Sequence, residues 1–231
     1  MEYTFRWKVP GLTFTRRMGE LLEAMERLQR AVALRETATD YGIAIDSPSQ
    51  RVTFSRSSLK IALLGPEADV PGGVWEVVWG ALAPEDVFLT KTRSMLTAAL
   101  PHADYDAARA HFARSSTDLA GTFEPTDAAI LLDVSVMGGG TAQVEYGVVE
   151  PQEARERLSN PRIGMAEHSG RQVLTDVDVA GLSAASVFAD VNYASRIPVD
   201  SSEGVLPACA SAGQVPITLV EKIRDTLAIS V

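Results

Sequence analysis

The fold is decided at the start of the chain, by the stretch Tyr3-Thr4-Phe5-Arg6-Trp7-Lys8-Val9. Apolar residues occupy every second position of this stretch, and threonine, arginine and lysine stand between them. Successive side chains of a strand point to opposite faces of a sheet, so the alternation predicts a half-buried β-strand. Pro10 and Gly11 follow directly and predict a break in the strand.

A helix is predicted over residues 16–36, because apolar residues recur there at steps of three and four and form one stripe. Strands are predicted next, near residues 41–45, 52–54 and 59–63, from short runs rich in β-branched and aromatic residues. The spacing of apolar residues over 75–82 favours a short helix, although the valine and tryptophan content would equally suit a strand. Helices are then predicted over residues 85–100 and 104–115, with Pro84 opening the first of them.

The second half of the chain predicts hairpins. Two apolar or alternating stretches, residues 128–136 and 141–149, are joined by three consecutive glycines. A short helix is expected from about residue 150 to 159, and a second hairpin is expected from residues 173–179 and 185–193. The segment 198–216 is rich in serine, glycine and proline and is expected to be irregular, so that the last helix opens at Pro216.

This order of elements predicts the class of fold. Regular alternation of strands and helices is missing, so parallel α/β folds are disfavoured and an antiparallel, hairpin-rich α+β fold is predicted, with helices packed on one face of the sheet. We expect the 231 residues to form one unit. The alternative is two fused α+β halves, residues 1–120 and 121–231, that meet at a hinge near residues 117–127.

Composition and charge restrict the function. A hydrophobic fraction of 46% with 22% charged residues is typical of globular proteins. The 21 Lys and Arg against 30 Asp and Glu give a net charge of −9, which on average repels nucleic acid and anionic membranes. Cys209 is the only cysteine, so no intrachain disulfide forms. No apolar stretch approaches the roughly 20 residues of a membrane span, and no signal peptide is visible, so a cytoplasmic protein is expected.

One short pattern resembles the nucleotidyltransferase superfamily. Residues 163–170 (Ile-Gly-Met-Ala-Glu-His-Ser-Gly) form a glycine-bearing turn, and Thr-Asp-Val-Asp-Val follows at residues 175–179. The resemblance implies that the turn holds a triphosphate and that Asp176 and Asp178 bind Mg²⁺, with Asp190 as a third carboxylate from the return strand. Alternation also allows a simpler interpretation, in which both aspartates lie on the solvent face of a hairpin.

Two further residues are candidates for acid–base chemistry. Asp133 interrupts the apolar run 128–136, where it is either a general base or part of a partly wet strand face with Leu131 and Ser135. His168 lies in a predicted loop, where it is either a proton carrier or a solvated side chain. Cys209 stands between alanines without a nearby cation, so an activated thiolate is not expected.

The aromatic side chains of the first strand, Tyr3, Phe5 and Trp7, are predicted to pack in the core. The alternative is that their strand forms an edge of the sheet and an interface between subunits. The leading hypothesis is a non-catalytic binding or assembly protein, a homo-oligomer that acts through a sheet face or edge. The alternatives are a metal-dependent nucleotidyl- or phosphoryl-transfer enzyme that uses Asp176 and Asp178, and a small-molecule carrier with an apolar pocket.

Overall fold

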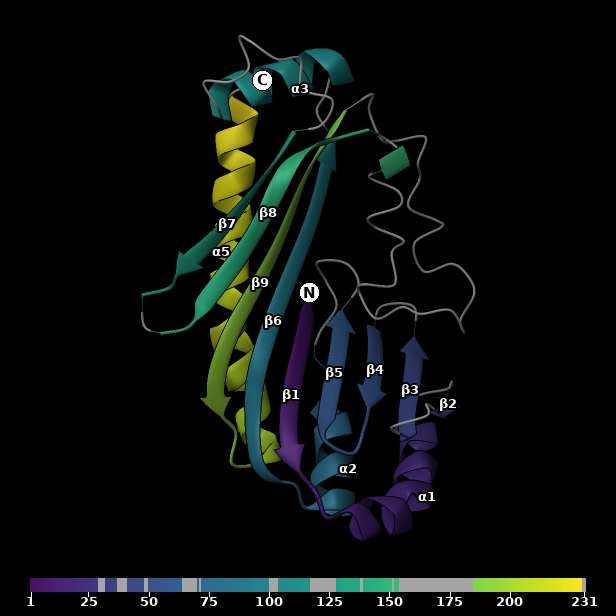
Figure 1. The fold of residues 1–231 in the computed structure, drawn as a ribbon. Coiled ribbons are helices and arrows are strands. Elements are labelled where there is room, and N and C mark those ends of the chain that lie inside the picture. Colours follow the sequence, from purple (N-terminus) through teal and green to yellow (C-terminus); the bar gives the residue numbers. More distant parts are fainter. Residues whose placement is uncertain are drawn as a thin grey trace. The chain divides into compact units, whose positions relative to one another are not determined.

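A computed structural model describes residues 1–28, 32–36, 41–47, 50–63, 70, 72–99, 104–116, 128–137, 139–150, 152–153 and 185–229 (Figure 1). The fold is α+β with an antiparallel sheet, which confirms the predicted class. In the described part of the chain the strands follow the order β2-β3-β4-β5-β1-β6-β9-β8-β7.

The elements have these bounds. The strands are β1 (Glu2–Lys8), β2 (Val32–Glu36), β3 (Tyr41–Ser47), β4 (Gln50–Phe54), β5 (Ser58–Leu63), β6 (Glu85–Ala99), β7 (Ala128–Ser135), β8 (Thr141–Val149) and β9 (Ser186–Pro198). The helices are α1 (Gly11–Leu28), α2 (Gly72–Leu82), α3 (Tyr105–Ser116) and α5 (Val205–Ile229), with a 3-10 turn η4 (Ser202–Gly204) before the last.

The chain divides into two compact units. The first unit consists of Met1–Thr92 and Ala194–Gly213, and the second consists of Arg93–Tyr193 and Gln214–Val231. The division therefore cuts through β6, β9 and α5, each of which contributes residues to both units. The hinge expected at residues 117–127 lies outside the described residues.

The core of the first unit lies on one face of its strands. The alternation in β1 places Tyr3, Phe5 and Trp7 on this face, where they are 6%, 0% and 4% exposed. Phe5 meets Trp75 of α2 edge to face, with ring centroids 4.4 Å apart. Gly213 of α5 lies directly against the Tyr3 hydroxyl. The helices thus cover the apolar face, and the predicted core role of these aromatic side chains is confirmed.

The strand that carries these aromatics is not a sheet edge, which corrects the alternative prediction. On one side β1 pairs with β5, with Phe5 opposite Leu59. On its other side lies β6, whose Thr90 hydroxyl donates to the Thr4 carbonyl oxygen at 3.1 Å. Because both hydrogen-bonding sides of β1 are used, Tyr3, Phe5 and Trp7 offer no strand edge to a second subunit.

In the second unit, α3 and α5 pack against the strands. Phe112 and Ala108 of α3 form a buried cluster with Val148 of β8 and Val187 of β9. Phe112 and Tyr146 meet edge to face at 6.0 Å, and Ile223 of α5 packs against the same cluster. The predicted helix over 104–115 and the predicted hairpin over 128–149 are therefore confirmed.

Two predicted helices have wrong boundaries, and a third is a strand. The first helix begins at Gly11 and ends at Leu28, because residues 32–36 instead pair with β3. Residues 85–99 form strand β6 and not a helix. The last helix begins at Val205, so Pro216 lies inside it and the segment expected to be irregular is largely helical. The loop and the strand expected over residues 160–179 lie outside the described residues, as does most of the helix expected over 150–159.

Candidate functional site

Strand β7 is the last strand of the described sheet (Figure 1). It pairs with β8 in an uninterrupted antiparallel register, from Ala128 opposite Val148 to Ser135 opposite Thr141. Within the residues that the structure describes, no strand lies on its other side. The backbone groups on that outer side are the kind that can pair with another strand.

The sequence of β7 lacks the features that protect an edge strand. Soluble proteins discourage pairing at edges with lysine, proline, bulges or short strands. β7 reads Ala-Ala-Ile-Leu-Leu-Asp-Val-Ser, which contains no lysine and no proline, and Asp133 is its single charge. The opposite end of the described sheet, β2, has five residues and carries Arg35 and Glu36. Of the two ends, β7 is thus the one suited to pairing.

Large apolar side chains are exposed along β7 and at its tip. Leu131 is 62% exposed and Leu132 is 45% exposed, although they point to opposite faces of the strand. Met137, in the turn that follows, is fully exposed. Ile130 is partly buried against the cluster that Phe112 of α3 forms with Val148 and Val187, and this contact anchors the strand. Exposed leucines therefore lie on both faces of the outer strand.

The β7–β8 turn is fixed in place by its glycines and by a tyrosine. Gly139 and Gly140 have φ angles of 108° and 93°, a conformation that side-chain-bearing residues rarely adopt. Val136 N–H donates to the Gly140 carbonyl oxygen at 3.1 Å and closes the turn. Tyr193 of β9 donates its hydroxyl to the Gly139 carbonyl oxygen at 2.9 Å. The hairpin thus presents β7 as an ordered edge.

Asp133 lies on the exposed face of β7. Leu131 and Ser135, two residues away on either side, are exposed with it. Gln143 Nε2 of the neighbouring strand donates to Asp133 Oδ1 at 3.5 Å, a long contact. The predicted partly wet strand face is therefore confirmed. A carboxylate in this setting is solvated and lacks the burial that would adapt it to general-base chemistry.

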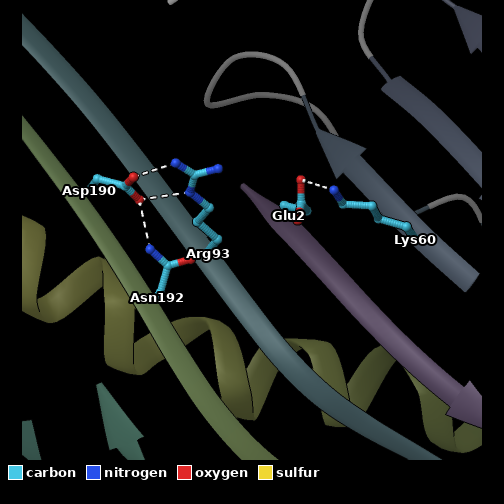
Figure 2. A network of polar contacts seen from close by, with 5 residues as sticks. All are labelled: Glu2, Lys60, Arg93, Asp190 and Asn192. Carbon is cyan, nitrogen blue, oxygen red and sulfur yellow. Dashed lines mark hydrogen bonds and ion pairs between the residues drawn. The ribbon is translucent and has the colours of Figure 1, made fainter. Parts of the chain in front are cut away.

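Asp190 forms a buried ion pair with Arg93 in the second unit (Figure 2). Arg93 Nε donates to Asp190 Oδ1 at 2.7 Å, and a terminal guanidinium nitrogen donates to Oδ2. Asn192 Nδ2 also donates to Oδ1, at 3.3 Å. Asp190 is 8% exposed and Arg93 is 9% exposed. A bidentate guanidinium already neutralises the carboxylate, so any divalent cation would have to compete with it.

The metal hypothesis stays a prediction. Asp176, Asp178 and His168 lie outside the described residues. Among the residues that the structure describes, no group of three or more His, Cys, Asp or Glu side chains could hold a metal ion. Glu2 and Lys60 form a second ion pair, in the first unit, with Glu2 Oε2 3.0 Å from Lys60 Nζ (Figure 2). This pair joins neighbouring strands β1 and β5 and has a structural role.

Sequence reasoning placed Leu131 on a partly wet strand face, but it missed Arg93 and the exposure of Leu132. Arg93 was placed in a predicted helix, which hid its position opposite Asp190 on the neighbouring strand. The apolar run over residues 128–136 was recognised, but its position at the end of the sheet depends on strand order. The absence of lysine and proline from this run is the signal that could have identified an unprotected edge.

Comparison with family models, with curated proteins and with solved structures gave no match to this chain. Among the helices that the structure describes, none has the length and apolar character needed to cross a membrane.

Proposed function

We propose that the protein is a non-catalytic assembly protein, in which β7 pairs antiparallel with β7 of a second copy to form a homo-oligomer. The observation that carries the proposal is the exposure of Leu131 and Leu132, at 62% and 45%, on an end strand with a regular register. A chain with a net charge of −9 repels its own copies, and they can approach most easily where charge is sparse.

The sequence of β7 is self-complementary in one register. When Leu131 lies opposite its own copy, Ile130 faces Leu132 of the second strand, and Ala129 faces Asp133. Opposite residues of antiparallel strands share a face, so both exposed leucines gain apolar neighbours. In this register Asp133 does not lie opposite Asp133 of the second copy. Like charges placed directly opposite each other would destabilise the sheet.

Covering the exposed leucines favours assembly. Complete burial of a leucine side chain contributes about 1.5–3 kcal/mol, so covering the exposed part of Leu131 contributes about 1–2 kcal/mol. Each copy supplies both leucines and a row of backbone donors and acceptors. These contributions act against the loss of translational and rotational freedom on association.

The first test replaces Leu131 with lysine, a residue that natural edge strands use to block pairing. Gln143→Lys is the matched control, because Gln143 is exposed on the adjacent strand and Asp133 faces it in the register. Light scattering after size exclusion should show a discrete oligomer for the natural chain and for Gln143→Lys, and a monomer for Leu131→Lys. A natural chain that stays monomeric at high concentration would end the proposal.

The second test identifies the register. Opposite residues of an antiparallel pair have Cα atoms about 4.5–5.5 Å apart, which a disulfide can span. Leu131→Cys should therefore form a disulfide-linked dimer on mild oxidation, while Gln143→Cys should not. Cys209 does not interfere, because it is 2% exposed. Equal cross-linking of both variants would indicate random collision and would contradict the register.

A further inference from the structure

Two neighbouring hollows open on the first unit. The smaller, of about 270 Å³, lies between β1, β6 and β9 and is lined by Arg6, Phe88 and Arg196 among others. The larger, of about 580 Å³, lies between the end of β1, the β4–β5 turn and the start of β6. Lys8 and Trp7 line both hollows, so they adjoin each other. The larger has the size of a small-molecule site.

Positive charge exceeds negative charge around these hollows, whose linings together hold Arg6, Lys8, Arg56 and Arg196 against Glu85 and Asp86. The smaller hollow has Arg6, Lys8 and Arg196 against Asp86. Lys8 and Asp86 neutralise each other through an ion pair at 2.5 Å. Within the described residues, neither Arg6 nor Arg196 has a carboxylate partner. Two guanidinium groups that form no ion pair among the described residues, on an acidic chain, favour an anionic ligand.

The cationic side chain of Arg196 is held in position before any ligand binds. Its guanidinium carbon lies 4.5 Å from the centroid of the Phe88 ring. The hydrogen bond from Lys8 lowers the pKa of Asp86, and the nearby charge of Arg196 lowers it further. Arg196 is thus close enough to act electrostatically on the Lys8–Asp86 pair. A positioned guanidinium loses less side-chain entropy when it binds an anion.

The larger hollow combines apolar and polar walls. Val9 and Pro10 supply apolar surface, and Arg56 and Ser57 supply the polar rim from the β4–β5 turn. Trp7 Nε1 donates to the Arg56 carbonyl oxygen at 2.8 Å and ties this turn to β1. The two hollows together therefore offer an anionic subsite beside a partly apolar one.

We propose that this surface binds a phosphate monoester with an apolar body. Arg6 and Arg196 hold the phosphate in the smaller hollow, since the guanidinium fork matches phosphate oxygens in a bidentate arrangement. The body of the ester lies in the larger hollow against Val9 and Pro10. The site is separate from β7 and does not depend on assembly.

The test titrates the full chain with phenyl phosphate, inorganic phosphate and phenol at low ionic strength, followed by calorimetry. Phenyl phosphate should bind saturably and more tightly than either fragment. Arg6→Gln and Arg196→Gln should each weaken it by about tenfold, the effect of one lost charge-assisted hydrogen bond. Arg16→Gln is the control, since Arg16 is an exposed arginine of α1 and its loss changes net charge equally. It should leave the affinity unchanged.

Several results would overturn this proposal. Absence of saturable binding would do so, and equal weakening in Arg16→Gln would show that only net charge matters. If inorganic phosphate bound as tightly as the ester, the larger hollow would have no role. Oligonucleotides and acidic peptides should be tested as well; the surface would be assigned to a macromolecule if one of them bound more tightly than phenyl phosphate and if Arg6→Gln and Arg196→Gln abolished that binding. Leu131→Lys should retain phenyl phosphate binding, which separates this result from the assembly proposal.

Discussion

Replacement of Gly213 by alanine should destabilise the first unit, although the same change normally stabilises a helix. Glycine inside a helix costs about 1 kcal/mol relative to alanine. A Cβ at Gly213, however, would lie 2.8 Å from the hydroxyl oxygen of Tyr3, well inside van der Waals contact. Tyr3 is 6% exposed and cannot move away freely. Overpacking of this kind costs about 1–3 kcal/mol, so the net effect should be a loss of about 0–2 kcal/mol.

The assay is urea unfolding followed by tryptophan fluorescence. Trp7, Trp75 and Trp79 are the only tryptophans and all lie in the first unit, so their fluorescence reports on the unit that contains Gly213. Gly80→Ala in α2 is the matched control, because a Cβ there meets nothing within 4 Å. Gly80→Ala should raise the free energy of unfolding by about 0.5–1 kcal/mol.

A second variant removes the clash and tests the reasoning. Tyr3→Phe deletes the hydroxyl oxygen, and the next ring atoms stand 3.7 and 3.8 Å from the new Cβ, which is ordinary contact. Gly213→Ala should then become stabilising in the Tyr3→Phe background. The double-mutant cycle should give a coupling energy of about 1–3 kcal/mol. If Gly213→Ala stabilises the natural chain as much as Gly80→Ala does, the close contact between α5 and β1 is refuted.

Three further predictions concern buried groups. Asp190→Asn should destabilise the second unit by about 3–5 kcal/mol because it removes the carboxylate that neutralises the buried Arg93 guanidinium. The double change Arg93→Met with Asp190→Leu should recover most of the loss in circular dichroism melts. Burial raises the pKa of the Cys209 thiol from 9.0 to about 12. The neutral thiol therefore contributes to the stability of the folded protein below pH 9, and this contribution is lost as the pH rises toward 12. In the Cys209→Ala variant, the urea midpoint of unfolding should fall less over this alkaline range. The thiol of Cys209 should react with an aromatic disulfide reagent only in step with the loss of tryptophan fluorescence, and fast labelling of the native protein would contradict its burial.

The sequence predicted elements well where one face is buried and the period is clear. The two-residue period of β1 predicted the observed strand, and the spacing of Trp75, Val78 and Leu82 favoured the observed helix α2, although the residue types there suited a strand equally well. These signals are local, because a half-buried strand or helix needs one apolar face whatever lies above it. The class of fold followed from the order of such elements.

Strand β6 shows where local reasoning failed. Pro84 is typical of a helix start, yet α2 ends just before it, where Ala83 adopts a left-handed φ of 41°. In β6 itself, Val87 and Leu89 are buried while Phe88 and Thr90 are half-buried, which is a strand period. Pairing with β1 and β9 decides this conformation. Such partners are remote in sequence, so local propensity does not reveal them.

The candidate site was harder to predict than the fold. Asp133 was selected for its charge, whereas its apolar neighbours Leu131 and Leu132 carry the proposed contact. The sequence shows Arg6 and Lys8 as charges on the first strand. Arg196 is distant along the chain and lies near them only because β1, β6 and β9 are neighbours in the sheet. A site assembled from strands that are distant along the chain cannot be identified from spacing alone.

The interleaving of the two units has a consequence for protein synthesis. Residues 194–213 complete the first unit, yet a ribosome makes them about a hundred residues after Thr92. Until then β1 lacks the cover that α5 supplies, because Gly213, which lies against the Tyr3 hydroxyl, has not yet been made. Chains whose contacts are so distant fold slowly and expose apolar surface in the interval. Nascent chains stalled before residue 194 should therefore be sensitive to protease and should be bound by chaperones, and neither unit should be obtainable as a simple N-terminal or C-terminal fragment.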